Sequence, residues 1–360
     1  MSLRHLPLRY RLSPLSPLSP LTQITHQPHH TPIPHPRPLS STPHPSRMAK
    51  VPPHRNSFAE VRFTASDVPP LDFWERLARP PLITPDLAPT LTASAIADAA
   101  TRYAALALEN APGWRTHLHR HQLSPHALHA AAAMILTGGG SRTFYLALHI
   151  LHTLTGAGYA PATLTTARLA LRTRGTPLSS PQFAGAREGL ERLWRRRESA
   201  DACTLMGLVY AAGNTPEDER SALQCFRAAR EVDDVKGVHA RGKARGEEWQ
   251  WKASALLHMG RIYLRRGQRE KAEMAFREGV CELDNAEACY CYATLLAEDD
   301  PQRVGLLEKA AMSGVVEAAR ELGRLELKRV DEEGLSKTEK LDRQVLADEW
   351  LGVAGDKALI

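Results

Sequence analysis

Acidic residues are missing from the first 59 positions of this 360-residue chain, and the first one is Glu60. The same stretch holds seven lysines and arginines, so subtracting seven from the net charge of +6 leaves −1 for the remaining 301 residues. The basic character of the chain therefore belongs to its N-terminal extension. This distribution disfavours a body that binds nucleic acid through a globally basic surface.

Long apolar runs and paired cysteines are also scarce. The longest nearly apolar stretch, Ala127 to Leu136, is interrupted by His129 and has about half of the length that a membrane-spanning helix needs. We therefore expect no transmembrane segment. The five cysteines form no C-x-x-C pair, so a zinc site is not expected. Most are interpreted as small buried apolar residues, with a disulfide between Cys281 and Cys289 as the alternative.

Signatures of enzymatic chemistry are absent as well. The sequence has no P-loop, no dinucleotide-binding glycine fingerprint and no His-Glu-x-x-His motif. Five histidines between His117 and His129 form the one ligand-like cluster, but the nearest carboxylate in the sequence is Glu109. A solvated polar face is the favoured interpretation of these histidines. We expect no catalytic residue, no cofactor and no metal, and we predict that the protein is not an enzyme.

Residues 1–56 have the composition of a disordered or targeting segment. Thirteen of the 26 prolines precede residue 54, and such a segment lacks the apolar periodicity of a packed core. The first twelve residues, MSLRHLPLRYRL, resemble a mitochondrial presequence because they alternate leucine with arginine and contain no acid. Pro7 departs from that pattern, since it would break an amphipathic helix. The resemblance implies a mitochondrial protein, in the matrix or associated with the inner membrane.

Two alternatives for the extension stay open. A cytoplasmic protein could carry it as a proline-rich tail, with an SH3-type ligand around residues 34–38. Met48 could also be the true start, in which case the signal would be absent.

The body of the chain has the periodicity of an all-α protein. From Ser94 onward, apolar residues recur at spacings of three and four, and breaks rich in Gly, Pro and Asn separate segments of 10 to 20 residues. Short breaks of this kind predict antiparallel helix hairpins. We expect a linker with short helical pieces over 57–95, a helical region with weak repeats over 96–196, and repeats over 197–360.

Four stretches of the repeat region share one phrase, in which an alanine is followed four residues later by a large apolar residue and then by Gly or Ala. The positions that define the first helices of these copies are Gly207 and Tyr210, Gly260 and Tyr263, Ala293, and Gly323. The second helices carry small and large residues at fixed places, among them Phe226, Ala272, Phe276 and Trp350. We expect the small residue to let two helices approach closely while the aromatic residues pack into neighbouring hairpins.

These phrases resemble the Sel1-like and tetratricopeptide (TPR) superfamily. The Gly or Ala positions are 53, 33 and 30 residues apart, so the first interval carries an insertion in the polar stretch 235–248. The resemblance implies an α-solenoid of antiparallel helix hairpins, a TPR/Sel1-like superhelix. The concave surface of such a solenoid binds an extended peptide or a helix of another protein.

The resemblance also implies which residues would bind a partner. Counting from Gly260, the groove-facing positions of the first helix are Leu257, Arg261 and Leu264. The clamp with which chaperone-binding TPR proteins hold a C-terminal carboxylate uses lysines and asparagines, and Leu257 and Ser254 do not match it. Packing of these residues against a neighbouring helix is the alternative.

The segment between Glu109 and Glu188 contains arginines but no acid. Residues 147–165 resemble a single pentatricopeptide (PPR) unit, and PPR arrays bind single-stranded RNA in organelles. The basic 110–187 region could therefore face RNA phosphates, an anionic membrane or an acidic partner. The repeat half is such an acidic surface, because residues 201–360 contain 24 cations and 30 anions, a balance of −6.

Together these patterns predict a non-enzymatic helical-repeat adaptor or scaffold that binds other proteins, in the assembly or quality control of a mitochondrial complex. One alternative is an organellar RNA-binding helical-repeat protein, and another is a cytosolic signalling scaffold. The sequence specifies neither the identity of a partner nor the oligomeric state.

Overall fold

The computed structural model describes residues 60–78, 91–110, 112–172, 178–213, 215–239, 249–331 and 334–355. All of them belong to one compact unit, Pro52–Ile360. Helices are the only regular elements within these ranges, so the all-α prediction is confirmed for them. The extension 1–56, with its predicted disorder and its presequence-like start, lies outside the described residues.

Within the described residues, six α-helices precede the predicted repeats. They are α1 (Leu71–Leu77), α2 (Ala93–Glu109), α3 (Pro125–Gly138), α4 (Ser141–Gly156), α5 (Ala160–Arg172) and α6 (Ala184–Arg195). Short 3-10 turns flank them at Ala65–Asp67, Trp114–Thr116, Leu118–His121 and Pro181–Phe183. From α1 to α6, each helix packs against the next one in the chain.

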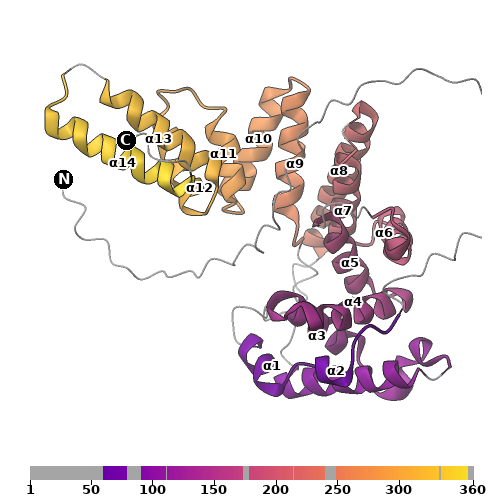
Figure 1. Cartoon of the computed structure of the whole chain (residues 1–360). Coiled ribbons are helices and arrows are strands. Elements are labelled where there is room, and N and C mark those ends of the chain that lie inside the picture. The colour runs from indigo at the N-terminus through magenta and orange to yellow at the C-terminus, as the bar shows by residue number, and fades with distance from the viewer. Residues whose placement is uncertain are drawn as a thin grey trace, which may run out of the picture. The chain divides into compact units, whose positions relative to one another are not determined.

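Four hairpins follow, and each contains one copy of the repeated phrase in its first helix. The pairs are α7 (Ala200–Ala211) with α8 (Pro216–His239), α9 (Lys252–Arg265) with α10 (Arg269–Cys281), α11 (Ala286–Ala293) with α12 (Pro301–Met312), and α13 (Val316–Val330) with α14 (Lys337–Val353). Figure 1 shows α9 beside α10 and α13 beside α14, and each of these pairs is in contact. The second helix of each earlier hairpin also contacts the first helix of the next one, which is the pattern of a solenoid.

Local sequence signals explain where several helices begin. The side chains of Thr92, Ser124 and Asn285 each accept a hydrogen bond from a backbone N–H in the first turn of α2, α3 and α11. Ser336 and Glu339 form a reciprocal capping box at the start of α14. These contacts satisfy backbone donors that the helix itself leaves without a partner.

The buried side chains of the described residues form three clusters. The N-terminal cluster surrounds Trp74 and Tyr103, the middle cluster surrounds Phe226 and Phe276, and the C-terminal cluster includes Leu307. The middle cluster begins in α5 and extends to α11. Helices α5 and α6 are therefore continuous in packing with the predicted repeats, although their sequence carries little of the repeated phrase.

Two connecting segments contain helical residues. The range 57–95, expected as a linker with short helical pieces, contains the short helix α1, whose Phe73, Trp74 and Leu77 are buried. The polar insertion 235–248 begins inside a helix, because α8 continues to His239, and its residues 240–248 lie outside the described residues. Among the described helices, none has both the length and the hydropathy to cross a membrane.

Candidate functional site

The close contact within each hairpin comes from glycine. A Cβ atom placed on Gly207 would lie closer than 3.0 Å to the ring of Phe226, and one placed on Gly260 would lie equally close to the ring of Phe276. Each phenylalanine belongs to the second helix of the same hairpin and is fully buried. The phrase therefore marks the place where the ring of the second helix rests on the backbone of the first.

The fourth hairpin uses an aliphatic residue for the same contact. A Cβ atom on Gly323 would lie 2.7 Å from Cγ of Leu351, whereas Trp350 is partly buried against the C-terminal cluster. Ala272, the small residue predicted for the second helix of the second copy, is fully buried. The role that we expected of an aromatic residue in the fourth copy is thus performed by the leucine that follows it.

The signature tyrosines contact the preceding hairpin. The ring of Tyr210 lies edge-on to that of Trp194 in α6, with their centroids 6.4 Å apart. Tyr263 is buried, and its hydroxyl oxygen accepts a hydrogen bond from Arg227 of α8 at 3.3 Å. Both tyrosines therefore hold one hairpin against the helix that precedes it in the chain.

The three predicted binding residues of α9 lie in different environments. Leu257 is buried in the middle cluster, and Leu264 is partly buried against the same cluster. The Arg261 side chain is 42% exposed, and its Nη2 atom lies 3.0 Å from Oε2 of Glu287 in α11. The pair Arg261–Glu287 joins the first helices of two successive hairpins. Of the three residues, Arg261 has the most accessible side chain.

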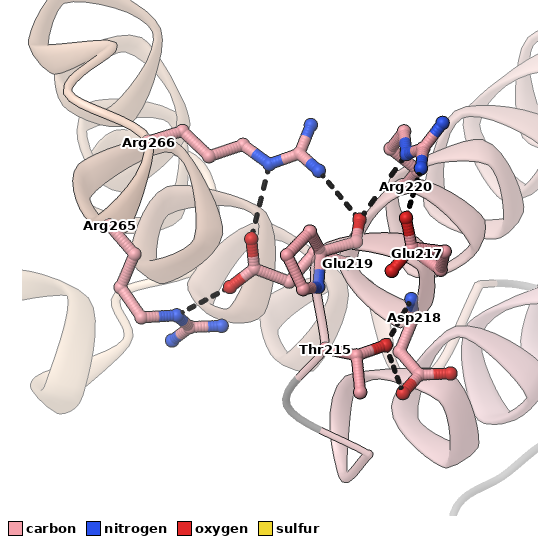
Figure 2. A network of polar contacts seen from close by, with 8 residues as sticks. Thr215, Glu217, Asp218, Glu219, Arg220, Arg265 and Arg266 are labelled. Carbon is pink, nitrogen blue, oxygen red and sulfur yellow. Dashed lines mark hydrogen bonds and ion pairs between the residues drawn. The ribbon is translucent and has the colours of Figure 1, made fainter.

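A polar network that sequence reasoning missed joins the first two hairpins of the repeat region. Figure 2 shows Glu219 between two arginines: Arg265 donates from Nε to Oε1 at 2.7 Å, and Arg266 donates from Nε to Oε2 at 3.1 Å. Arg266 also donates to the carbonyl oxygen of Pro216 at 3.0 Å. The hydrogen bond from Arg265 is the largest influence on the Glu219 carboxyl and lowers its pKa below the ordinary value; burial opposes this effect, and the hydrogen bond from Arg266 lowers the pKa further.

The charges of this network also suit the helix ends at which they lie. Glu219 lies in the acidic first turn of α8, and Arg265 lies in the last turn of α9. A helix N-terminus favours negative side chains and a C-terminus favours positive ones. In the sequence, these groups appear only as the acidic run Glu217 to Glu219 and a pair of arginines 46 residues later. Nothing in the sequence indicates that the two segments are in contact.

The arginines of the acid-free segment do not form one exposed surface. Arg168 is half-buried, with its guanidinium 5.5 Å from the ring centroid of Trp251. Arg115 is also half-buried, and its Nη2 atom lies 3.1 Å from Nε2 of His149. Exposed guanidinium groups remain at Arg120, Arg142 and Arg172. The basic character that the sequence suggested is therefore partly used for packing.

A buried polar cluster in the N-terminal region is another feature without a sequence signal. His149 is 1% exposed. Because the guanidinium group of Arg115 can only donate, Nε2 of His149 accepts a hydrogen bond from it. The imidazole proton is then on Nδ1, which lies 2.7 Å from the hydroxyl oxygen of Tyr103. That hydroxyl group also lies within reach of the His149 carbonyl oxygen and of Thr153 Oγ1, at 2.9 and 2.7 Å. Burial raises the pKa of the Tyr103 phenol.

Burial shifts the pKa of several other histidines and cysteines among the described residues. His129 is partly buried, and burial lowers its pKa to about 4. Among the described residues, no three His, Cys, Asp or Glu side chains lie together as ligands for a metal ion. All five cysteines are free, including Cys281 and Cys289. Burial raises the pKa of Cys203 to about 11 and that of Cys225 to about 12, so both thiols are protonated at neutral pH.

Comparisons with known proteins add no family assignment. No protein-family model, curated protein or solved structure matches the chain.

Proposed function

We propose that this protein is a non-enzymatic helical-repeat scaffold of the Sel1-like and TPR type, which binds other proteins during the assembly or quality control of a mitochondrial complex. The observation that carries the proposal is the repeated contact between a glycine in the first helix and a large side chain in the second helix of three hairpins. Repeated hairpins expose an extended surface of side chains, and proteins built in this way use that surface for binding.

The surface formed by the first helices of the hairpins is the proposed site of protein binding. Helices α5, α7 and α9 pack against one another in succession, and the ion pair between Arg261 and Glu287 extends this row to α11. Arg261 is the residue of the predicted set with an accessible side chain, so it is the proposed contact. Arginine suits such a place because its planar guanidinium binds carboxylates and stacks on aromatic rings.

The proposed mitochondrial location rests on the presequence-like start, MSLRHLPLRYRL. Its test is expression of the full chain with a C-terminal tag, cell fractionation, and sequencing of the N-terminus of the mature protein. Cleavage within residues 1–56 and protection from protease inside mitochondria support the proposal. An intact N-terminus in the cytosol contradicts it and would favour a cytosolic signalling scaffold.

The proposed protein binding has a separate test in the same extracts. The tagged chain is fractionated by native size before and after treatment with ribonuclease. A scaffold elutes well above the size of the free chain, and ribonuclease leaves that size unchanged. A complex that collapses with ribonuclease would instead support RNA binding through the exposed arginines of the acid-free segment.

A further inference from the structure

One face of the last described helix, α14, carries large apolar side chains that no described helix covers. Exposed fractions are 61% for Leu341, 51% for Val345, 37% for Leu346 and 58% for Val353. The opposite side of α14 is buried through Ala347. The helix therefore has two apolar sides, and only one of them packs against the rest of the protein.

Acidic side chains share this exposed side of α14. At 3.6 residues per turn, residues spaced by four, three and four lie in one row along a helix. Two neighbouring rows result, and we call their eight residues the α14 outer face: Leu341, Val345, Asp348 and Gly352, and beside them Asp342, Leu346, Glu349 and Val353. The α14 outer face thus holds four apolar side chains, three carboxylates and no base.

These carboxylates have no partner within the protein as the structure describes it. Glu326 of α13 pairs with Arg329 at 2.5 Å and with Arg343 at 2.9 Å, and Glu339 accepts the cap hydrogen bonds of Ser336. By contrast, no ion pair among the described residues involves the carboxylates of the α14 outer face. An apolar surface with uncompensated acids requires a partner with apolar and basic groups at matching spacings.

We infer that the α14 outer face binds an amphipathic helix of a partner protein, with apolar residues on the docking side and lysine or arginine beside them. The position in the array favours a helix, because α8, α10 and α12 are each covered by the first helix of the following hairpin. A second copy of α14 is disfavoured as the occupant, since it would bring three carboxylates against three. The inference rests on the proposed function, since it assigns one binding surface and one kind of partner to the scaffold.

The test uses three synthetic 16-residue peptides of fixed composition and the full chain. The first peptide repeats leucine and arginine with a helical period, the second has the same residues in an order without an apolar face, and the third replaces arginine with glutamate. Fluorescence anisotropy should show micromolar binding of the first peptide alone. Raising the salt concentration should weaken this binding, because part of it is charge attraction.

Variants of the α14 outer face locate the site. The double substitution Leu341→Ser/Val345→Ser should weaken binding of the first peptide at least tenfold. Asp342→Asn/Glu349→Gln should weaken it severalfold and reduce its dependence on salt. The matched control is Met274→Ser in α10, an equally exposed apolar residue (68%) outside the α14 outer face, which should leave binding unchanged. Circular dichroism checks that each variant is folded.

Three results would overturn the inference. They are undiminished binding to the Leu341→Ser/Val345→Ser variant, equal binding of the peptide without an apolar face, and self-association of the chain through this face, measured by light scattering and lost in the same variant. Any of them would remove the α14 outer face as a site for a basic helix. The proposed function would stand as long as the native complex resists ribonuclease, so the two failures can be told apart.

Discussion

At the scale of single residues, the glycines of the hairpins make a prediction about stability. Gly260→Ala places a methyl group against the ring of Phe276, where the available distance is under 3.0 Å. Overpacking of this kind costs about 1 to 3 kcal/mol, which exceeds the gain of about 1 kcal/mol that alanine gives inside a helix. Chemical unfolding should therefore show a net loss of stability.

The control for this prediction lies in α12. Gly305 has nothing within 4 Å of an added Cβ atom, so Gly305→Ala should stabilise the protein by up to about 1 kcal/mol. Gly260→Ala should cost less stability in a Phe276→Leu background than in the wild type, because the smaller side chain leaves room for the added methyl group. Equal and favourable effects at Gly260 and Gly305 would show that the close contact is absent.

The second residue-scale prediction concerns Glu219 and pH. Its two arginine partners lower the pKa of the carboxyl group in the folded protein relative to the ordinary 4.5. The folded state therefore gains stability that is complete above pH 4.5 and is lost as the pH falls through the lowered pKa. Glu219→Gln should cost about 1 kcal/mol at pH 7, and this cost should shrink below pH 4.5.

Denaturant titrations of wild type and variant at pH 7 and pH 3 measure this difference. The matched control is Glu298→Gln, because Glu298 and its partner Lys328 are both about 70% exposed. Its effect at pH 7 should be smaller than that of Glu219→Gln. A pH-independent cost at Glu219 would contradict the assigned ion pairs.

At the scale of elements, the capping box of α14 makes a local prediction. Ser336→Ala removes the side-chain acceptor of the Glu339 backbone N–H, and the loss of such a cap costs about 1 kcal/mol. Hydrogen exchange of the α14 amides should then accelerate about fivefold, whereas α2 to α4 should keep their protection. Thr338→Ala, at the second position of the same helix, is the control and should leave exchange in α14 nearly unchanged.

A different outcome would change the view of this helix. If Ser336→Ala accelerated exchange equally in all hairpins, α14 would unfold only together with the whole protein. The α14 outer face would then be present as long as the whole array is folded, because α14 would not unfold separately.

The sequence predicts the helices well because the pattern of each helix lies within a few neighbouring residues. Gly207 and Gly260 occur in nearly the same phrase, and the structure places both phrases in the first helix of a hairpin. Contacts between distant segments are different. Tyr103 and His149 are 46 residues apart, and no local pattern indicates that one hydroxyl group and one imidazole share a buried site.

The same distinction applies to the candidate site. The place of Leu257 in the phrase allows it either to face the groove or to pack against a neighbouring helix, and the structure buries it in the middle cluster. A single helix has several apolar positions, and which of them is covered depends on the helices beside it. The α14 outer face escapes sequence reasoning for that reason, because its apolar residues recur at the same spacing as those of a buried helix face.

At the scale of the whole molecule, charge divides the chain. The N-terminal extension is basic, and residues 201–360 carry −6 from 24 cations and 30 anions. Such an acidic repeat region attracts basic partners and repels the phosphates of nucleic acids. The charge distribution therefore agrees better with a protein partner at the repeats than with RNA at that surface.

The most direct test of the central claim, protein binding through the first-helix row, is site-specific photo-cross-linking in cells. A benzophenone amino acid replaces Arg261 in one variant and the exposed Arg142 in another. The account predicts protein adducts from position 261 that resist ribonuclease, and none of comparable yield from position 142. Absence of protein adducts at 261, together with RNA recovered on the chain after ultraviolet cross-linking, would contradict it.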